Sequence, residues 1–531
     1  MLLDGEVISI LILLFLTLTI IINFEGTFIP NVKGQSSEEK EKEKEEDNSI
    51  IIHDPRFKAK LVVSGLDFPT NMAFIGKDDF LIIEKETGLV KRIVDGNVTE
   101  PLLQLPVSGR DERGLLGIDV DEANYHGLYF TSVFLSYVEC KNKDFCENKV
   151  VRFLLDYDSN KLVYPQELFS IESFPDDSHV GGVLKVGPDN NIYLSVGDFH
   201  GTDFTPIYKT QAQNFNKGDA PDGRGGILRF TQDGNPVDNG ILGYEYPLNL
   251  YFAYGIRNSF GINFDPLTGN LWDTENGPDY GDEINLVEPG FNSGSLKVFG
   301  KYNSNPGPTF HSITGFNIEQ EKGPDDLVTF NGHGKYSDPE LTWKETVAPT
   351  SITFLDSNAL GHNYQNDMFV ANAKAGKIYN FDLSSDRKQL SLPDPLADKV
   401  VDSEDEANSV TFAEGFGLIT DLEVNPYDGY LYVVAPIKGA SGKGSVYKLM
   451  PKSPDLISFP SGIEPIQENQ QQTSFPQLDN LGKCDELEMK DKIVWKDWEK
   501  GLLTDEQAIH LGDQIIQLMI ANRCDINKVN S

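Results

Sequence analysis

The feature that most constrains the fold is a strand–turn–strand pattern that recurs along the chain. Each unit has an apolar strand, a turn rich in Asp, Asn, Gly or Pro, a second apolar strand, a polar loop and a further strand. The six units occupy 71–93, 114–155, 179–230, 250–287, 350–383 and 419–449. Such a series predicts an all-β fold, a six-bladed β-propeller, which hides sheet edges by radial repetition. A β-sandwich is the alternative, but repeated four-strand units fit it poorly.

The N-terminal segments differ in composition from the repeats. Residues 1–34 contain an apolar run from Val7 to Phe24, and the charged residues before it are all acidic. The run predicts a signal peptide cleaved near Gly34-Gln35 or a retained membrane anchor. Residues 35–56 are highly charged and predict a disordered tether. We therefore expect an exported protein that is extracellular or anchored to the outer face of the cell membrane.

The C-terminal part is different again. The propeller is predicted over 57–452 and is followed by a Pro- and Gln-rich linker at 453–482. Residues 483–531 predict a small helical extension, with helices at 491–500 and 504–522. No chemistry is assigned to this extension, because an apolar stripe on a helix is most often a packing surface.

The charge balance excludes several partners. The chain has 82 acidic and 45 basic residues, a formal net charge of −37. This charge argues against nucleic acid and anionic lipid as ligands. The 4 cysteines are too few to build the fold. They leave two local pairings open, Cys140 with Cys146 and Cys484 with Cys524.

The propeller topology itself selects the candidate site residues. The loop before the first strand of each unit and the loop after its second strand open on the same mouth of a propeller. The residues before first strands are Glu112, Ser178-His179, Arg257-Asn258, Thr346 and Thr420. The residues after second strands are Glu84, Asp198, Gly277-Pro278, Lys374 and Lys438. So many polar residues at one mouth predict a ligand site.

The residue types indicate the chemistry. His179 can accept a proton near neutral pH, although a lone loop histidine is more often merely solvated. Arg257 and Asn258 offer planar donors to a carbonyl or carboxylate oxygen. The carbonyls of Gly277 and Pro278, beside acidic residues, suit a hard cation such as calcium, whereas a surface turn with a salt bridge is the structural alternative.

Several motifs together resemble those of the soluble quinoprotein glucose/sorbosone dehydrogenase family. Members are six-bladed propellers that bind pyrroloquinoline quinone (PQQ) and calcium. The resemblance covers roughly 61–449. The motifs are ERGLLGIDV (112–120), HVGGVLKVGPDNNIYLSVGD (179–198), YGIRNSFGINF (254–264), ENGPDYGDEIN (275–285), TVAP (346–349) and AKAG (373–376).

The resemblance implies roles for individual residues. His179 matches the catalytic base, and Asp198 matches an acid that orients it. Arg257 and Asn258 match residues at the reactive carbonyl of the quinone. The remaining matches are cofactor contacts at Thr346 and Lys374, a site-lining position at Glu112 that holds Gln in some members, carbonyl ligands of the cofactor's calcium at Gly277 and Pro278, and a structural calcium ligand at Glu283.

The resemblance also implies an activity, the PQQ- and calcium-dependent oxidation of an aldose sugar at its anomeric hydroxyl. Electrons then pass to an external acceptor. The chain departs from the family at Leu418 and Thr420, where members offer two arginines to the cofactor, and at Lys344, where the glucose enzyme has an aromatic wall. We expect Lys374 with Lys438 or Lys443 to supply the missing positive charge. The alternative function is an exported propeller that has lost PQQ and binds glycan or protein.

Overall fold

The computed structural model describes residues 50–125, 128–175, 177–199, 209–302, 326–436 and 442–453, and a few positions beyond 490. The predicted N-terminal apolar run, Lys438, Cys484, Cys524 and nearly all of the two predicted C-terminal helices lie outside these residues. The predicted domain boundaries therefore stay predictions. Within the described residues, no helix combines the length and the apolar character needed to cross a membrane.

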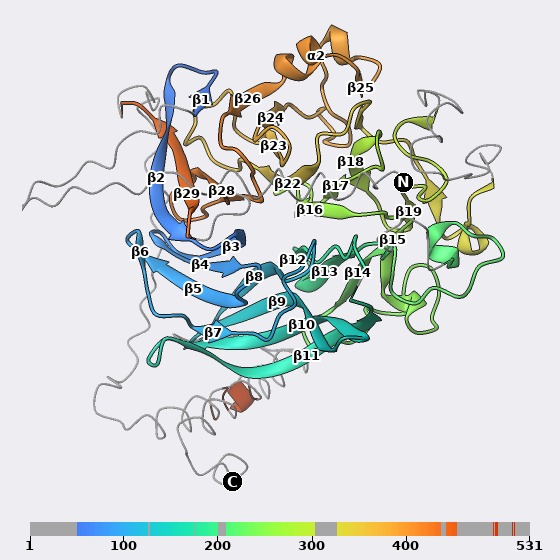
Figure 1. The fold of residues 1–531 in the computed structure, drawn as a ribbon, viewed down its shortest axis with the longest axis horizontal. Coiled ribbons are helices and arrows are strands. Elements are labelled where there is room, and N and C mark those ends of the chain that lie inside the picture. Colours follow the sequence, from blue (N-terminus) through green and yellow to red (C-terminus); the bar gives the residue numbers. More distant parts are fainter. Residues whose placement is uncertain are drawn as a thin grey trace, which may run out of the picture. The chain divides into compact units, whose positions relative to one another are not determined.

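The first three sheets along the chain come from residues 69–336 (Figure 1). The first contains β3 (Pro69–Gly76), β4 (Asp79–Glu84), β5 (Leu89–Val94), β6 (Asn97–Val98) and β7 (Leu103–Gln104). The second contains β8 (Leu115–Tyr125), β9 (Leu128–Asn142), β10 (Phe145–Asp156) and β11 (Lys161–Ser173). The third contains β12 (Leu184–Val186), β13 (Asn191–Val196), β14 (Gly226–Thr231), β15 (Tyr251–Tyr254), β19 (Phe291–Asn292) and β20 (Lys335–Tyr336).

Three further sheets complete the described strands, and two of them include strands from the start of the chain. The fourth contains β16 (Ser259–Phe264), β17 (Leu271–Glu275), β18 (Asp282–Val287), β21 (Leu341–Trp343) and β25 (Val400–Val401). The fifth contains β22 (Pro349–Phe354), β23 (Met368–Asn372), β24 (Ile378–Phe381), β26 (Thr411–Glu414) and β1 (Ile51–Ile52). The sixth contains β27 (Asp421–Val424), β28 (Leu431–Ala435), β29 (Gly444–Pro451) and β2 (Phe57–Leu66).

The sheets are arranged as in a propeller. The first strands of successive sheets contact one another in the cyclic order β3, β8, β12, β16, β22, β27 and back to β3. Helix is scarce between residues 50 and 453, where the described residues contain the short α-helix α2 (Glu404–Ser409) and a few 3₁₀ turns. The predicted all-β class and propeller architecture are therefore confirmed.

The hydrophobic core lies between neighbouring sheets. A separate cluster of buried apolar residues occupies each interface, from the one between the first and second sheets to the one between the sixth and first. Trp272 and Trp343, for example, are both almost fully buried in the cluster between the fourth and fifth sheets. Burial of apolar surface on both faces of each sheet therefore holds the ring together.

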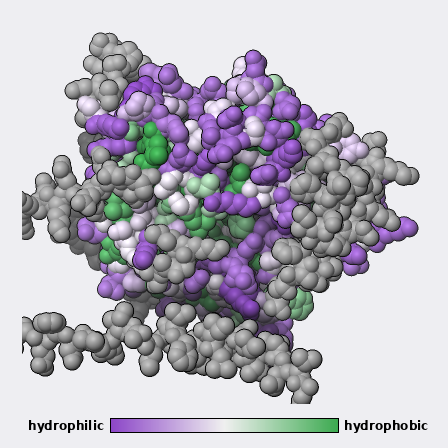
Figure 2. Space-filling model, turned by 45° about the horizontal axis from the view of Figure 1, so that its top comes forward, coloured by the Kyte–Doolittle hydropathy of each residue, from purple (hydrophilic) through white to green (hydrophobic). Residues whose placement is uncertain are grey.

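The N-terminal strands close this ring. β2 pairs antiparallel with β29, so residues from the two ends of the described propeller share the sixth sheet. β1 pairs with β26, with Ile51 opposite Glu414. Residues 50–56 thus differ from the predicted tether at 35–56, because their apolar isoleucines extend the edge of the fifth sheet. Where the coloured surface is visible in Figure 2, hydrophilic residues predominate, as the acidic composition leads one to expect.

Candidate active site

The loops at one end of the innermost strands surround a cavity of about 650 Å³. Most of the site residues selected from the sequence line it: Glu112, His179, Arg257, Asn258, Gly277, Pro278, Thr346 and Lys374. Leu418 and Thr420, where the family has arginines, line it too. These strand ends therefore meet at one cavity, as predicted. The chemical role of each residue stays a prediction.

The β16–β17 hairpin brings the first of these groups together. Ser259 pairs with Glu275, so the residues before β16 lie beside those after β17. Arg257 Nη1 donates hydrogen bonds to the carbonyl oxygens of Asn276 at 2.7 Å and Gly277 at 2.9 Å. These bonds fix a guanidinium at the cavity wall, and 7 % of Arg257 remains exposed.

His179 lies at the centre of the hydrogen-bond network. Its Nδ1 is 2.9 Å from Asp198 Oδ1, and its Nε2 is 3.1 Å from Arg257 Nη2. A carboxylate only accepts hydrogen bonds, so Nδ1 carries the proton and Nε2 presents a lone pair to the guanidinium. Asp198 itself does not line the cavity; it lies behind the imidazole and orients it.

Burial keeps this imidazole neutral. The side chain of His179 is almost fully buried, and this burial lowers its pKa below the ordinary value of 6.5. The positive charge of Arg257 lowers the pKa further, while Asp198 opposes the shift. A neutral imidazole with a fixed tautomer and a lone pair at the cavity is the form that a general base needs.

Backbone geometry explains the residues around His179. Its φ of 55° lies in the left-handed region, which non-glycine residues adopt uncommonly. Gly197, which precedes Asp198, packs directly against this backbone. A Cβ added at Gly197 would lie 1.9 Å from the carbonyl oxygen of His179, so only glycine lets β13 approach closely enough.

Glu112 holds two neighbouring loops in place. One carboxylate oxygen, Oε2, accepts hydrogen bonds from the backbone N–H of His179 at 2.7 Å and from Asn258 Nδ2 at 3.1 Å. The Asn258 amide is therefore oriented, and its Oδ1 is buried without a hydrogen-bond partner among the described residues. Asn258 itself lines the cavity, and a buried acceptor without a partner is rare in folded proteins.

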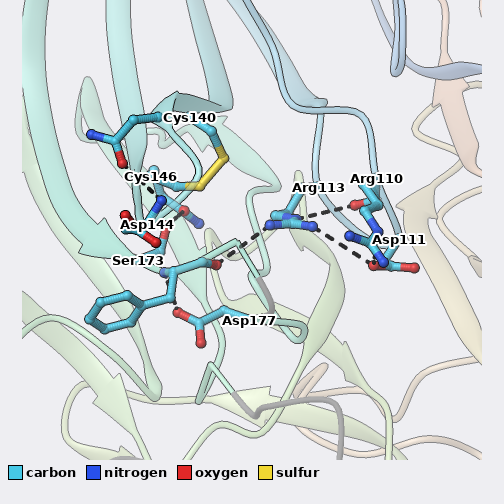
Figure 3. The surroundings of a disulfide bond; sticks show 11 residues. Arg110, Asp111, Arg113, Cys140, Asp144, Cys146, Ser173 and Asp177 are labelled. Carbon is cyan, nitrogen blue, oxygen red and sulfur yellow. Dashed lines mark hydrogen bonds and ion pairs between the residues drawn. A yellow bond between two sulfur atoms is a disulfide. The ribbon is translucent and has the colours of Figure 1, made fainter.

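The loop that carries Glu112 is itself anchored on both sides. Lys85 Nζ donates to the carbonyl oxygens of Gly109 at 3.1 Å and Asp111 at 2.6 Å. On the other side, Arg113 reaches the carbonyl of Phe174 at 3.5 Å, and its guanidinium lies 3.8 Å from Asp111. Figure 3 shows Arg113 extending from this loop toward β11, near the Cys140–Cys146 disulfide. That disulfide confirms one of the two pairings left open by the sequence.

Of the other predicted residues, some line the cavity and some do not. Lys374 Nζ donates to the Thr346 carbonyl at 2.9 Å and contacts its hydroxyl, so this pair borders the cavity together. Glu84 does not line the cavity; its Oε1 forms an ion pair with Lys91 Nζ at 2.6 Å within the first sheet. Its neighbour Lys85 lines the cavity instead. Neither Lys344 nor Lys443 is among the lining residues.

Glu283, predicted as a structural calcium ligand, is buried and does not line the cavity. Its Oε1 accepts from the Gly300 N–H at 2.5 Å, and its Oε2 accepts from Ser293 at 3.2 Å. Glu275 shares the Ser293 hydroxyl at 2.6 Å, so two acids adjoin. Burial raises the pKa of Glu283 to about 8. Within the described residues, no set of three or more His, Cys, Asp or Glu side chains is placed to hold a metal.

Sequence reasoning missed several lining residues. Lys85 was missed by one position, because β4 ends at Glu84 and the next side chain turns into the cavity. The aromatic rings of Phe68 and Phe260 also line the cavity, and Phe68 lies 5.5 Å from the Lys85 ammonium. Asp282 was considered only as part of an acidic loop. It accepts the backbone N–H groups of Gly277, Val347 and Ala348, which fixes the loop after β17.

Comparison with known proteins gives a consistent result. The model of the family described as "Glucose / Sorbosone dehydrogenase" matches residues 66–441. Quinoprotein glucose dehydrogenase B of Acinetobacter calcoaceticus is 24% identical over 462 residues, covering 76% of this chain and 91% of that protein. The soluble aldose sugar dehydrogenase of Escherichia coli, solved in its apo-form, superposes with a TM-score of 0.56 at 21% identity over 75% of this chain and 100% of that one.

A further solved structure has its cofactor. The PQQ-bound form of an aldose sugar dehydrogenase from Streptomyces coelicolor superposes with a TM-score of 0.50 at 21% identity, covering 74% of this chain and 98% of that one. At this identity the likeness concerns the fold.

Proposed function

Because the chain belongs to the glucose/sorbosone dehydrogenase family, we propose that it oxidises an aldose sugar at its anomeric hydroxyl with PQQ and calcium as cofactors. Electrons then pass to an external acceptor. The observation that carries the proposal is the arrangement Asp198–His179–Arg257 at the wall of the cavity, with distances of 2.9 and 3.1 Å between successive groups.

The cavity fits a quinone that carries carboxylates. Its volume is about 650 Å³, within the range of cofactor sites. Three cationic side chains, Lys85, Arg257 and Lys374, line it. Leu418 and Thr420 add no charge, so we expect weaker binding than a site with two more arginines would give. We propose the carbonyls of Gly277 and Pro278 as calcium ligands, since both residues border the cavity.

The residues of the chain divide the work of the reaction. PQQ, when bound, would supply the group that accepts a hydride, that is, a proton with two electrons, from the sugar carbon. When the sugar hydroxyl replaces Arg257 Nη2 as the partner of His179 Nε2, this nitrogen takes its proton, so that the C=O bond forms as the C–H bond breaks. Asp198 stabilises the imidazolium that results. Arg257 donates hydrogen bonds to oxygen atoms on which negative charge develops beside the base.

We also propose that the protein is exported, either released outside the cell or held at the outer face of the membrane by its N-terminal segment. Support comes from the apolar run between Val7 and Phe24 and from the acidic composition. A small-molecule sugar and an electron acceptor are the proposed partners. Nucleic acid is not, because the net charge is −37.

Sugar oxidation with an artificial electron acceptor tests the proposal. With PQQ and calcium added, we expect aldose-dependent reduction of the acceptor, and His179→Ala should lower kcat by about 100-fold or more with an unchanged melting temperature. His333→Ala, which changes an exposed histidine away from the cavity, is the matched control and should retain activity. Wild-type turnover in His179→Ala would refute the assignment of the base. Failure of every aldose would instead favour the binding-module alternative.

A further inference from the structure

One acidic side chain at the cavity wall has an unusual environment. Glu112 uses only Oε2 for its two hydrogen bonds, to the His179 N–H and to Asn258 Nδ2. No lysine, arginine or histidine of the described residues forms an ion pair with it within 4.0 Å. Glu112 is half-buried and lines the cavity, so its other oxygen is available to a ligand.

The position of this carboxylate is fixed. Both hydrogen bonds hold Oε2, and Lys85 and Arg113 anchor the loop on either side of it. Lys85 binds carbonyl oxygens there, and not a carboxylate. A ligand beside His179 therefore meets a negative charge that cannot swing away. Such a charge favours hydrogen-bond donors and cations and repels anions.

Two further observations point in the same direction. Asn258 lines the cavity, and its buried Oδ1 has no hydrogen-bond partner among the described residues, while its Nδ2 donates to Glu112. Glu86 and Asp111 also line this side of the cavity. The cation Arg257 lies on the loop before β16 of the fourth sheet, and the cation Lys374 lies on the loop after β23 of the fifth sheet. Lys85 lines this side too, but it binds backbone carbonyls. The base therefore has the cation Arg257 beside its imidazole and the carboxylate of Glu112 at its backbone N–H.

We propose that Glu112 determines the charge preference for the substrate, so that the site takes amino sugars and neutral aldoses and rejects sugar acids. The proposal rests on the proposed function and adds the substrate class. The ammonium or a hydroxyl of the sugar donates to Glu112, while the hydroxyl to be oxidised faces His179. A carboxylate on the sugar in the same place would lie against a like charge.

The substitution Glu112→Gln separates charge from positioning. The amide oxygen of glutamine can accept the same two hydrogen bonds from His179 and Asn258, so the loop keeps its place while the negative charge disappears. Glu86→Gln is the matched control, because it removes a charge from the same wall at an exposed residue that forms no hydrogen bond or ion pair with His179 or Asn258. Equal melting temperatures would establish that all three proteins are folded.

The experiment compares glucosamine, glucose and glucuronate at neutral pH. One readout is kcat/KM with PQQ, calcium and an artificial acceptor; the other is calorimetric binding of each sugar to the full-length apo-protein. We expect the wild type to prefer glucosamine to glucuronate, and Glu112→Gln to reduce this ratio by about tenfold, equivalent to about 1.4 kcal/mol. Glu86→Gln should reduce it by much less.

Each outcome is decisive. A ratio that Glu112→Gln leaves unchanged, or that Glu86→Gln reduces as much, overturns the inference even if sugars are oxidised. If no sugar is oxidised but the binding ratio falls in Glu112→Gln alone, the inference stands and the proposed activity fails. If the apo-protein binds none of the sugars and oxidises none, both fail.

Discussion

The side chain of His179 shows how its surroundings determine what one imidazole can do. Asp198 fixes the tautomer, and Arg257 Nη2 lies 3.1 Å from the lone pair on Nε2. Burial, followed by the charge of Arg257, lowers the pKa. Sequence alone predicted the identity of these residues, because they stand at strand ends that a propeller brings together. It could not predict which nitrogen faces which partner.

We expect the pH dependence of kcat/KM to report this lowered pKa. The base works only when unprotonated, so activity should fall as pH drops through the pKa of His179 in the folded enzyme. Since that pKa is lowered from 6.5, the midpoint of the acidic limb should lie below pH 6.5. Arg257→Gln should move the midpoint upward, because it removes a positive charge. A wild-type midpoint above pH 6.5 would contradict this electrostatic account.

Other residues of the site show the limits of sequence reasoning. Glu112 was predicted as a residue that lines the site, but its hydrogen bonds through Oε2 to His179 and Asn258 could not be predicted. Lys85 was not predicted at all, since the end of β4 cannot be placed to a single residue from composition. Both differences depend on side-chain direction, which periodicity does not determine.

At the scale of elements, the β16–β17–β18 sheet positions Arg257, Asn258 and the Gly277-Pro278 loop at the cavity. The turn at Asp265–Gly269 is of the Asp-, Gly- and Pro-containing kind predicted for each unit, and it places Arg257 beside Gly277 through the register Ser259–Glu275. The sequence also contained Glu283 within its acidic loop. That loop could not reveal that Glu283 points away from the cavity, because alternation along β18 depends on the register with β17.

Calcium should stabilise this element. Burial raises the pKa of Asp273 from 3.8 to about 7 and that of Glu283 from 4.5 to about 8, so above these ordinary values the folded state binds more protons than the unfolded state. The free energy of unfolding without calcium should therefore fall as pH rises toward about 8. Calcium favours ionised carboxylates, so it should raise the melting temperature more at about pH 8 than at about pH 6.

Melting curves with calcium or with a chelator measure this effect. Glu283→Gln should abolish most of the calcium-dependent increase, while Glu288→Gln, an exposed acid after the end of β18, is the control. Equal melting temperatures with calcium and with chelator at both pH values would count against a metal site in this sheet.

At the scale of the whole propeller, closure depends on a strand from the start of the chain. β2 completes the sixth sheet and buries Phe57, Val63 and Leu66. The sequence predicted the repeats but not the pairing of β2 with β29, because no tight turn joins β2 to the strand that it pairs with. Long-range pairing depends on how the ring closes, and local pattern carries no information about that.

Removal of β2 should open the ring. A chain that begins at Asp67 loses three buried apolar side chains, each contributing about 1.5–3 kcal/mol, so its free energy of unfolding should fall by roughly 5 kcal/mol or more. A chain that begins at Ile50 keeps every described strand and serves as the control. Denaturant unfolding measures the difference. Equal stability of the two chains would show that β2 is dispensable.

The central claim is that the cavity binds PQQ, and calorimetric titration of the apo-protein with PQQ tests it most directly. We predict saturable, calcium-dependent binding, weakened roughly tenfold by Lys374→Met, since a charge-assisted contact is worth about 1.5–3 kcal/mol. Lys344→Met changes an exposed lysine outside the cavity lining and should leave binding unchanged. Absence of saturable binding up to about 1 mM PQQ with calcium present would contradict the account.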